Sequence, residues 1–159
     1  ATLADPARID VRGNLTIGQD VLIDVNVVFE GDVTLGNNVS IGPNCVIRDA
    51  QLADNVTVHA NSIIKGAEVA EQCQVGPFAR LRPGTRLARS AKVGNFVETK
   101  KAIVGEGSKI ALVAPVAVDN DAVIGAGSTI TSHVPEKDLA VARSRQRNIK
   151  GWKRPEKKD

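Results

Sequence analysis

A repeat of six residues runs through most of this chain and limits the folds that it can adopt. From Ile17 onward a residue that is nearly always aliphatic recurs at every sixth position, with three single steps of five. The residue four positions later is usually small or β-branched, and Asn, Asp or Gly is common three positions later. The series reads Ile17, Ile23, Phe29, Leu35, Ile41, Ile47, Leu52, Val58, Ile64, Val69, Val75, Leu81, Leu87, Val93, Thr99, Val104 and Ile110.

A period of six fits neither the 3.6 residues of a helix nor the alternation of a long strand. It predicts short extended segments joined by corners, since Asn, Asp and Gly tolerate a left-handed backbone. Three segments close a coil of about 18 residues, and coils stack at a strand spacing of about 4.8 Å. The pattern therefore predicts an all-β chain, a parallel β-helix of hexapeptide repeats, because a β-sandwich would show irregular turns and period-two strands. The expected corner residues are Asp20, Asn26, Asp32, Asn38, Asn44, Asn55, Asn61, Gly84 and Gly107.

The repeat divides the chain into three parts. Residues 1–16 form a lead-in, 17–134 the β-helix, and 135–159 a C-terminal tail with nine Lys and Arg against four Asp and Glu from Glu136 onward. A phase break lies at 110–112, because Leu112 follows Ile110 by only two residues, so "GSKI" and "ALVAPV" read as two segments whose middle is absent. The tail contains the only Trp, Trp152, and either stays disordered or docks on a phosphate ligand or a neighbouring chain.

Composition excludes several classes of protein. Aromatic residues make up 3% of the chain, so the core must consist of Val, Ile, Leu and Ala. We expect no membrane span and no signal peptide, and two cysteines make no disulfide framework, so a cytoplasmic location is predicted. Cys45 and Cys73 occupy inward positions and are interpreted as buried thiols. His59 and His133 cannot supply the three His of a β-helical zinc enzyme, and the Thr residues are too scattered for an ice-binding face.

Two fragments, "VGPFARLRPGT" and "VGNFVETKK", place Phe78 and Phe96 18 residues apart. Eighteen residues make one coil, so the two rings should occupy the same corner of successive coils and stack. We interpret them as covering a coil edge or an interface between chains, in preference to binding a ligand.

Basic residues follow the aliphatic position on one side of successive coils. Like charges opposed on neighbouring strands destabilise a sheet, so the row suggests a site for a phosphate or diphosphate. The alternative is a solvated edge neutralised by acids such as Asp49 and Glu98. We favour that alternative for Arg48 and Lys65, and the phosphate site for Arg82 and Lys100, which adjoin Arg80 and Lys101. In order, this row reads Glu30, Arg48, Lys65, Arg82 and Lys100.

Several blocks of sequence point to a family. The segments "DPARIDVRG", "GPFARLRPGT", "VGNFVETKKAIVGEGSK", "LVAPV", "IGAGSTIT" and "GWKRPEKK" closely resemble the C-terminal domain of the bacterial bifunctional N-acetylglucosamine-1-phosphate uridyltransferase / glucosamine-1-phosphate N-acetyltransferase. The resemblance covers almost the whole chain. It implies a left-handed β-helix and a cytoplasmic homotrimer that acts in cell-wall precursor synthesis, with active sites between subunits and no metal, nucleic acid or membrane span in this domain.

The resemblance also implies roles for particular residues. Arg82 and Lys100 match the family residues that bind the sugar phosphate, and Ala126 and Arg143 match residues that contact acetyl-CoA. The family's general base is a His in a "His-Leu-Thr-Tyr" stretch directly after the segment matching "GEGSKI". This chain continues with "ALVAPV" instead, so no catalytic residue carries over, and the sugar-binding Tyr, Asn and Lys of that stretch are missing as well.

Two functional hypotheses follow from these observations. The first is an acetyltransferase that moves the acetyl group of acetyl-CoA to the amine of glucosamine 1-phosphate. The second is a shortened trimeric β-helix that serves as a scaffold and has lost turnover along with its general base. A hexapeptide acyltransferase acting on another amine or hydroxyl is a third possibility, and the family-specific blocks argue against it.

Overall fold

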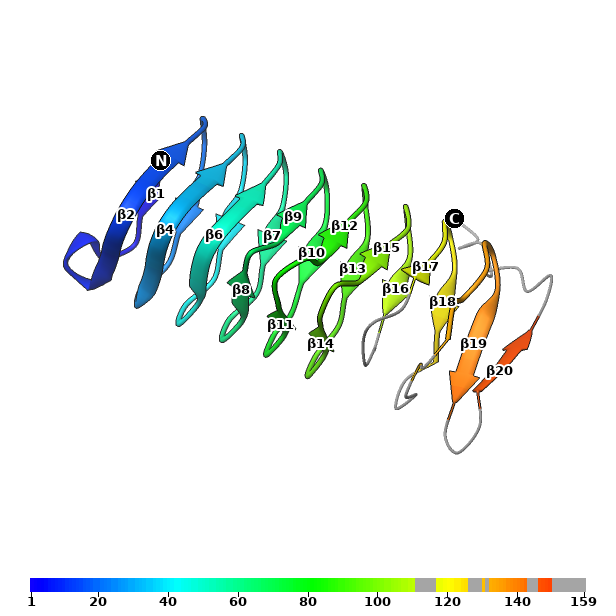
Figure 1. The fold of residues 1–159 in the computed structure, drawn as a ribbon. Coiled ribbons are helices and arrows are strands. Elements are labelled where there is room, and N and C mark those ends of the chain that lie inside the picture. The colour runs from blue at the N-terminus through cyan, green and yellow to red at the C-terminus, as the bar shows by residue number, and fades with distance from the viewer. Residues whose placement is uncertain (111–116, 126–129, 131, 143–145, 150–159) are drawn as a thin grey trace, which may run out of the picture.

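The computed structural model describes residues 1–110, 117–125, 130, 132–142 and 146–149. These residues form a parallel β-helix whose coils stack in a row from the N-terminus onward (Figure 1). The elements are β1 Thr2–Leu3, a 3-10 turn η1 Pro6–Arg8, β2 Ile9–Ile17, β3 Leu22–Ile23, β4 Val27–Leu35, β5 Ser40–Ile41, β6 Val46–Leu52, β7 Thr57–Val58, β8 Ile63–Lys65, β9 Glu68–Val69, β10 Gln74–Val75, β11 Arg80–Leu81, β12 Arg86–Leu87, β13 Lys92–Val93, β14 Glu98–Thr99, β15 Ile103–Val104, β16 Lys109–Ile110, β17 Ala117–Val118, β18 Val123–Ile124, β19 Leu139–Ala142 and β20 Gln146–Ile149.

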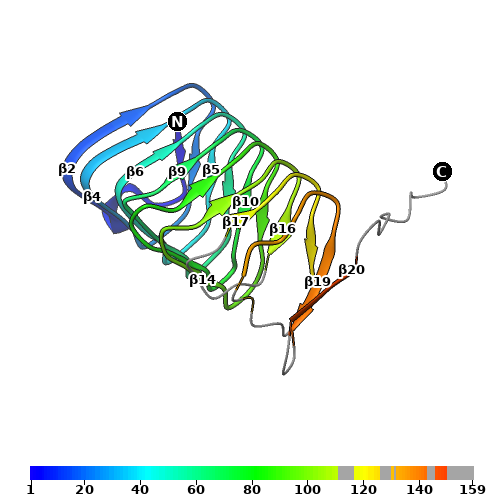
Figure 2. The ribbon, with the colours of Figure 1, turned by 45° about the vertical axis from the view of Figure 1, so that its right-hand side comes forward.

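Each coil contributes to three faces. The first face contains β3, β5, β7, β10, β13, β16 and β18 in one parallel ladder. The second face contains the N-terminal halves of β2, β4 and β6 and then β8, β11 and β14, and the third contains their C-terminal halves and then β9, β12, β15 and β17. From β2 through β16 paired residues are 17 or 18 positions apart, for example Gln74 with Lys92 and Lys92 with Lys109, so one coil is one repeat of three segments. Figure 2 shows the successive coils stacked one behind another.

The corners confirm the expected left-handed backbone at eight of the nine predicted residues. Asp32 is the exception, because the second-to-third corner of that coil turns at Gly31, with a φ of +67°, beside an irregularity in the pairing of β4 with β6. Side chains that do not favour this conformation adopt it as well, since stacking on the coil below fixes the position of the corner. Such residues are Gln72, Phe78, Ser90, Phe96, Lys101 and Lys137.

The core is a stack of aliphatic layers along the axis of the β-helix. All predicted inward residues that the structure describes are buried except Ile17, which is 40% exposed because it lies on the first coil, where only one side of the strand is covered. Buried hydroxyls enter the stack in the later coils. Thr85 Oγ1 and Thr99 Oγ1 are 3.1 Å apart, and the hydroxyl of Ser62 accepts a hydrogen bond from the Ala79 amide, so these groups have partners.

Strand pairing extends beyond the expected boundaries of the β-helix at 17 and 134. β1 and β2 pair with β3 and β4, and β19 pairs with β18 on one side and, in antiparallel fashion, with β20 on the other. No helix among the described residues is long and apolar enough to span a membrane.

The pairing changes at the predicted phase break. β15 pairs with β17 and β16 with β18 at a separation of 14 residues, as in Ile103 with Ala117 and Lys109 with Val123. The ladder of the second face ends at β14 within the part of the chain that is described. Two faces therefore continue across the break in described residues. Leu112 itself lies outside those residues.

Candidate functional site

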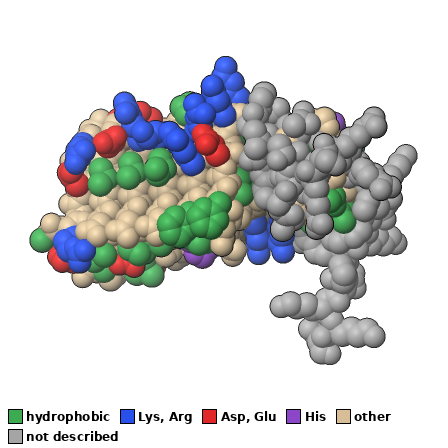
Figure 3. Space-filling model, turned by 90° about the horizontal axis from the view of Figure 1, so that it is seen from below, with side chains coloured by type: hydrophobic (Ala, Val, Ile, Leu, Met, Phe, Trp, Pro, Cys, Tyr) green, Lys and Arg blue, Asp and Glu red, His purple; other side chains and the backbone are tan. Residues whose placement is uncertain are grey.

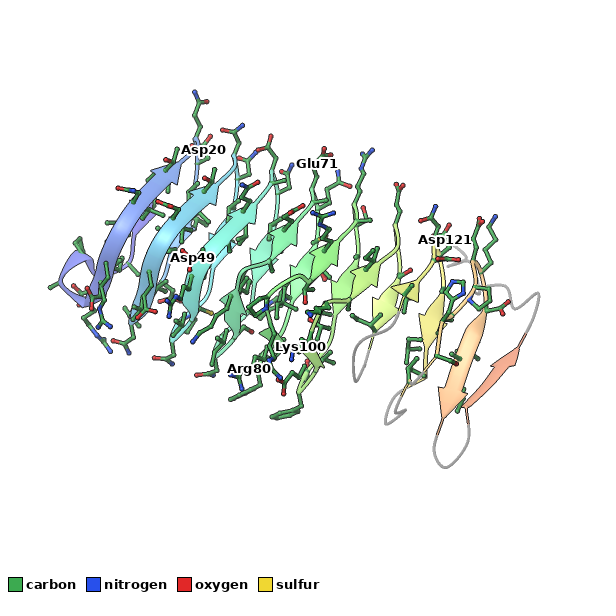
Figure 4. All side chains as sticks on the ribbon, in the orientation of Figure 1. Asp20, Asp49, Glu71, Arg80, Lys100 and Asp121 are labelled. Carbon is green, nitrogen blue, oxygen red and sulfur yellow. The ribbon has the colours of Figure 1, made fainter. Side chains whose placement is uncertain are left out.

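The row of charged side chains lies where the second face turns into the third. Pairing aligns Arg12 with Glu30, Glu30 with Arg48, and Arg48 with Lys65. β11 and β14 continue the row, because Leu81 pairs with Thr99 and places Arg82 and Lys100 directly after these two residues. The geometry thus brings the predicted residues onto one edge of the molecule, and Figure 4 shows Lys100 and Arg80 together near β11 and β14.

Acidic side chains neutralise the N-terminal part of this row. Arg12 and Arg48 both contact Glu30, at 3.3 and 3.9 Å, and Arg48 Nε donates a hydrogen bond to Asp49 at 3.2 Å. The guanidinium of Arg12 is also bound by Asp10, whose hydrogen bond and charge raise the arginine pKa above its usual value. Figure 3 shows basic and acidic side chains interleaved along this edge. The prediction of a neutralised edge is confirmed for Arg48.

The C-terminal part of the row, around Arg82 and Lys100, keeps more positive charge than the N-terminal part around Arg12 and Arg48. Arg82 Nη1 donates to Glu98 Oε1 at 3.0 Å, an ion pair that leaves its other guanidinium hydrogens available. Lys100 is exposed and forms no ion pair with any described residue, and the same holds for its neighbours Lys101 and Arg80. Counted over Arg80, Arg82, Lys100, Lys101 and the one acid Glu98, four cations meet one carboxylate. An anion placed here meets a pre-existing excess of positive charge.

The other candidate residues are distributed away from this edge. Cys45 and Cys73 are buried as predicted, with their thiols directed at the carbonyls of His59 and Ala88 at 3.3 and 3.0 Å. Burial raises the pKa of both thiols, that of Cys73 to about 11. His133 Nε2 lies 2.9 Å from Asp119 Oδ2.

His59 is exposed on the first face, one position after β7. No group of three His, Cys, Asp or Glu side chains is placed to hold a metal ion in the described part of the chain. Ala126 and Arg143, the predicted acetyl-CoA contacts, lie outside the described residues, so their contact with acetyl-CoA stays a prediction.

Phe78 and Phe96 stack as predicted, with ring centroids 5.1 Å apart and planes inclined by 15°. They continue a corner row that begins with Asn26, Asn44 and Asn61, where Asn26 donates to Asn44 at 2.8 Å. Both rings remain exposed, Phe78 by 49% and Phe96 by 79%. That the rings cover a coil edge or an interface between chains stays a prediction.

The chain is a left-handed parallel β-helix of the hexapeptide-repeat class, with stacked three-segment coils and buried aliphatic rows. Two solved structures share this fold. The hexapeptide transferase family protein from Anaplasma phagocytophilum has a TM-score of 0.52 and 16% identity and covers 91% of this chain and 84% of its own. The acetyltransferase domain of PglB from Neisseria gonorrhoeae has a TM-score of 0.53 and 12% identity and covers 89% and 57%.

The chain belongs to the family described as the GMPPB C-terminal domain, which matches residues 11–111. Among curated proteins it is 53% identical to the bifunctional protein GlmU of Marinobacter nauticus and 48% identical to that of Saccharophagus degradans, in both cases over 99% of this chain and 45% of the relative. The resemblance predicted from the sequence is thereby confirmed. The chain spans about 45% of the length of these relatives.

The alignments with these relatives contain many positions at which this chain has no residue. The match to the Marinobacter protein runs over 203 positions, whereas the chain has 159 residues, so at least 44 positions (203 less 159) are without a counterpart. Matches to other relatives run over 202 to 204 positions. The relatives therefore have aligned positions that this chain lacks. That these positions form one segment at the phase break at 110–112 stays a prediction.

Proposed function

We propose that this chain is the sugar-phosphate-binding part of an acetyltransferase that transfers the acetyl group of acetyl-CoA to the amine of glucosamine 1-phosphate. The observation that carries the proposal is the excess of positive charge at Arg82 and Lys100, which lie side by side on an edge aligned with the GlmU relatives. Arg82 would bind the phosphate through its free guanidinium hydrogens, and Lys100 would supply a second positive charge. We propose a cytoplasmic homotrimer as the active assembly.

The reaction needs groups beyond a phosphate anchor. The amine nitrogen attacks the thioester carbonyl carbon, the amide bond forms, the carbon–sulfur bond breaks, and coenzyme A leaves as the thiol. The substrate ammonium must first lose a proton to a general base. His59 belongs to the first face and His133 is engaged by Asp119, whereas the phosphate anchors lie at the corner between the second and third faces. We therefore assign the role of base to neither.

We infer that this chain binds the sugar phosphate and transfers acetyl groups slowly. Loss of a general base alone typically lowers the rate by about 10²- to 10⁴-fold. The resemblance implies that both the base and part of the sugar pocket belong to a stretch after Ile110 that this chain lacks, and at least 44 aligned positions of the relative have no counterpart here. The alternative, a shortened trimeric scaffold that binds the ligand weakly or not at all and has no turnover, rests on the same gap.

Binding and turnover measured on the same preparation separate the two functions. Calorimetry would record the binding of glucosamine 1-phosphate, with unphosphorylated glucosamine as the matched control ligand, and a thiol-release assay would record acetyl transfer. We expect the phosphorylated sugar to bind and its control to bind at least tenfold more weakly, with thiol release far below that of an uninterrupted relative. Equal binding of the two sugars, or no binding of either, would overturn the proposal in favour of the scaffold.

A further inference from the structure

The first face contains a depression that the proposed function does not use. It has a volume of about 600 Å³ and lies across β10, β13, β16 and β18. The phosphate anchors Arg82 and Lys100 are not among its lining residues, because they belong to another corner of the coil. The described residues that line it are His59, Gln74, Gly76, Lys92, Val93, Gly94, Asn95, Lys109, Ile110 and Ile124.

The charged side chains of this first-face depression are all basic. Lys92 pairs with Lys109 in the ladder of β13 and β16, so two ammonium-bearing side chains stand directly opposite each other at strand spacing. Opposed like charges destabilise a sheet unless another charge compensates them. No carboxylate is among the described lining residues, and neither lysine takes part in an ion pair with any described residue.

This lack of compensation distinguishes the depression from the third face and the corner that follows it. On the third face Arg86 donates to Glu68 at 3.1 Å, and at the following corner Arg89 contacts Glu71 at 3.7 Å, so cations there have acids one coil away. In the depression the uncharged polar side chains Gln74 and Asn95 form no hydrogen bond with another described side chain. Donors and positive charge thus converge on a space that no described acid fills.

Two glycines line this depression. Gly76 lines the depression with a φ of +92°, and a Cβ at this position would overlap the Ser62 hydroxyl, so only glycine fits. Gly94 follows it one coil later in the same row.

We propose that the first-face depression is a second anion site, which binds a phosphate group between Lys92 and Lys109 with Gln74, Asn95 and His59 as additional hydrogen-bond partners. Ammonium groups bind phosphate as point charges and accept it from several directions, which suits a shallow surface site. This site is separate from the Arg82 and Lys100 anchors and does not depend on the proposed acetyl transfer.

The bound phosphate could belong to a nucleotide or be free inorganic phosphate. Only a nucleotide would also contact the neighbouring corner. Asn95 lines the depression and precedes Phe96, whose ring is 79% exposed and stacked on Phe78. A nucleotide bound through its phosphate could lay its base on this aromatic pair, because every base offers a π-face to an aromatic side chain. Free inorganic phosphate would use the lysines alone.

The test is a titration of the full chain with inorganic phosphate, followed by the amide signals of Gln74, Gly94 and Asn95 in NMR spectra. We expect these amides to shift, and the Lys92→Gln/Lys109→Gln double variant to bind at least tenfold more weakly. The matched control Arg86→Gln/Arg89→Gln removes the same charge from the third face and its corner and should change the affinity less than twofold. Unfolding midpoints of both variants establish that each remains folded.

Two results would overturn the site. One is the absence of shifts at these amides while those around Arg82 respond, and the other is an equal loss of affinity in the control variant, which would mean a general charge effect. A parallel titration with adenosine monophosphate assigns the source. Tighter binding that Phe96→Ala abolishes supports a nucleotide, and equal binding of both ligands supports free phosphate at the same lysines.

Discussion

Arg82 has fewer acidic partners than Arg48, which precedes it in the same row of charged side chains. Arg48 is held between Glu30 and Asp49, whereas Arg82 has the single partner Glu98. A hydrogen bond to a charged group contributes about 1.5–3 kcal/mol when its partner would otherwise be unpaired. We therefore expect Arg82→Gln to weaken glucosamine 1-phosphate binding by about 10- to 100-fold in calorimetry. Arg48→Gln is the matched control and should change the affinity less than twofold.

Glu98 competes with an incoming phosphate for Arg82. Removing its carboxylate therefore provides a second test of whether Arg82 binds the phosphate. The carboxylate accepts from Arg82 at 3.0 Å and lies in register with Arg80. We expect Glu98→Gln to tighten binding of the phosphorylated sugar, because it removes a negative charge and frees a donor. A loss of affinity in this variant would place the phosphate elsewhere.

Cys73 is a buried thiol whose ionisation is suppressed by its surroundings. Burial raises its pKa from 9.0 to about 11, and the thiolate is the reactive form. The folded chain therefore holds the proton more tightly than the unfolded chain. The free energy of unfolding should fall as the pH rises from about 9 to about 11, where the unfolded thiol ionises first. Urea unfolding at pH 8 and pH 10.5 measures this change.

Cys73→Ala supplies the control for that titration. The variant loses packing at every pH but should lose less further stability between pH 8 and pH 10.5 than the parent chain. In the native state we also expect slow alkylation of both cysteines at pH 8, followed by fast alkylation after unfolding. An identical pH dependence in parent and variant would show that other groups cause the decline.

The corners show what a repeat can and cannot predict. Asn, Asp and Gly at fixed positions identified eight corner residues, because these side chains favour the left-handed backbone by themselves. Gln72, Ser90 and Lys101 do not favour it, so only stacking on a neighbouring coil identifies them. The same limit applies to the site. Spacing predicted that Arg82 and Lys100 adjoin, but the choice of Glu98 as partner of Arg82 depends on side-chain conformations that no spacing specifies.

Gly31 forms a corner whose left-handed backbone favours glycine. Its φ is +67°, and a Cβ would overlap the carboxylate of Asp49, the residue at the equivalent corner of the next coil. A left-handed conformation costs a residue with a Cβ about 1–2 kcal/mol before any clash is counted. Gly31→Ala should therefore lower the free energy of unfolding by at least that amount in urea titrations. Thr34→Val, an exposed and isosteric change on β4, should alter it by less than about 0.5 kcal/mol.

The stack as a whole behaves as a one-dimensional array, so a defect in one interface matters to everything beyond it. In solenoids each coil contacts only its neighbours, and stability is the sum of coil and interface contributions. Across the break the described pairing involves the first and third faces, at a separation of 14 residues in place of 17 or 18. The second face, whose described ladder ends at β14, contributes no described pairing there. The interface at the break should therefore be the weakest in the stack.

Unfolding of the two sides of the break should consequently be uncoupled. We expect hydrogen exchange to be faster at the paired amides of β17, β18 and β19 than at those of β5, β7 and β10, and unfolding by urea to show two transitions. An uninterrupted GlmU relative, trimmed to the same boundaries, should unfold in one transition with a higher midpoint, since all three faces continue through its stack. A single transition in this chain, at an equal or higher midpoint, would mean that the coil at the break has repacked without loss of stability.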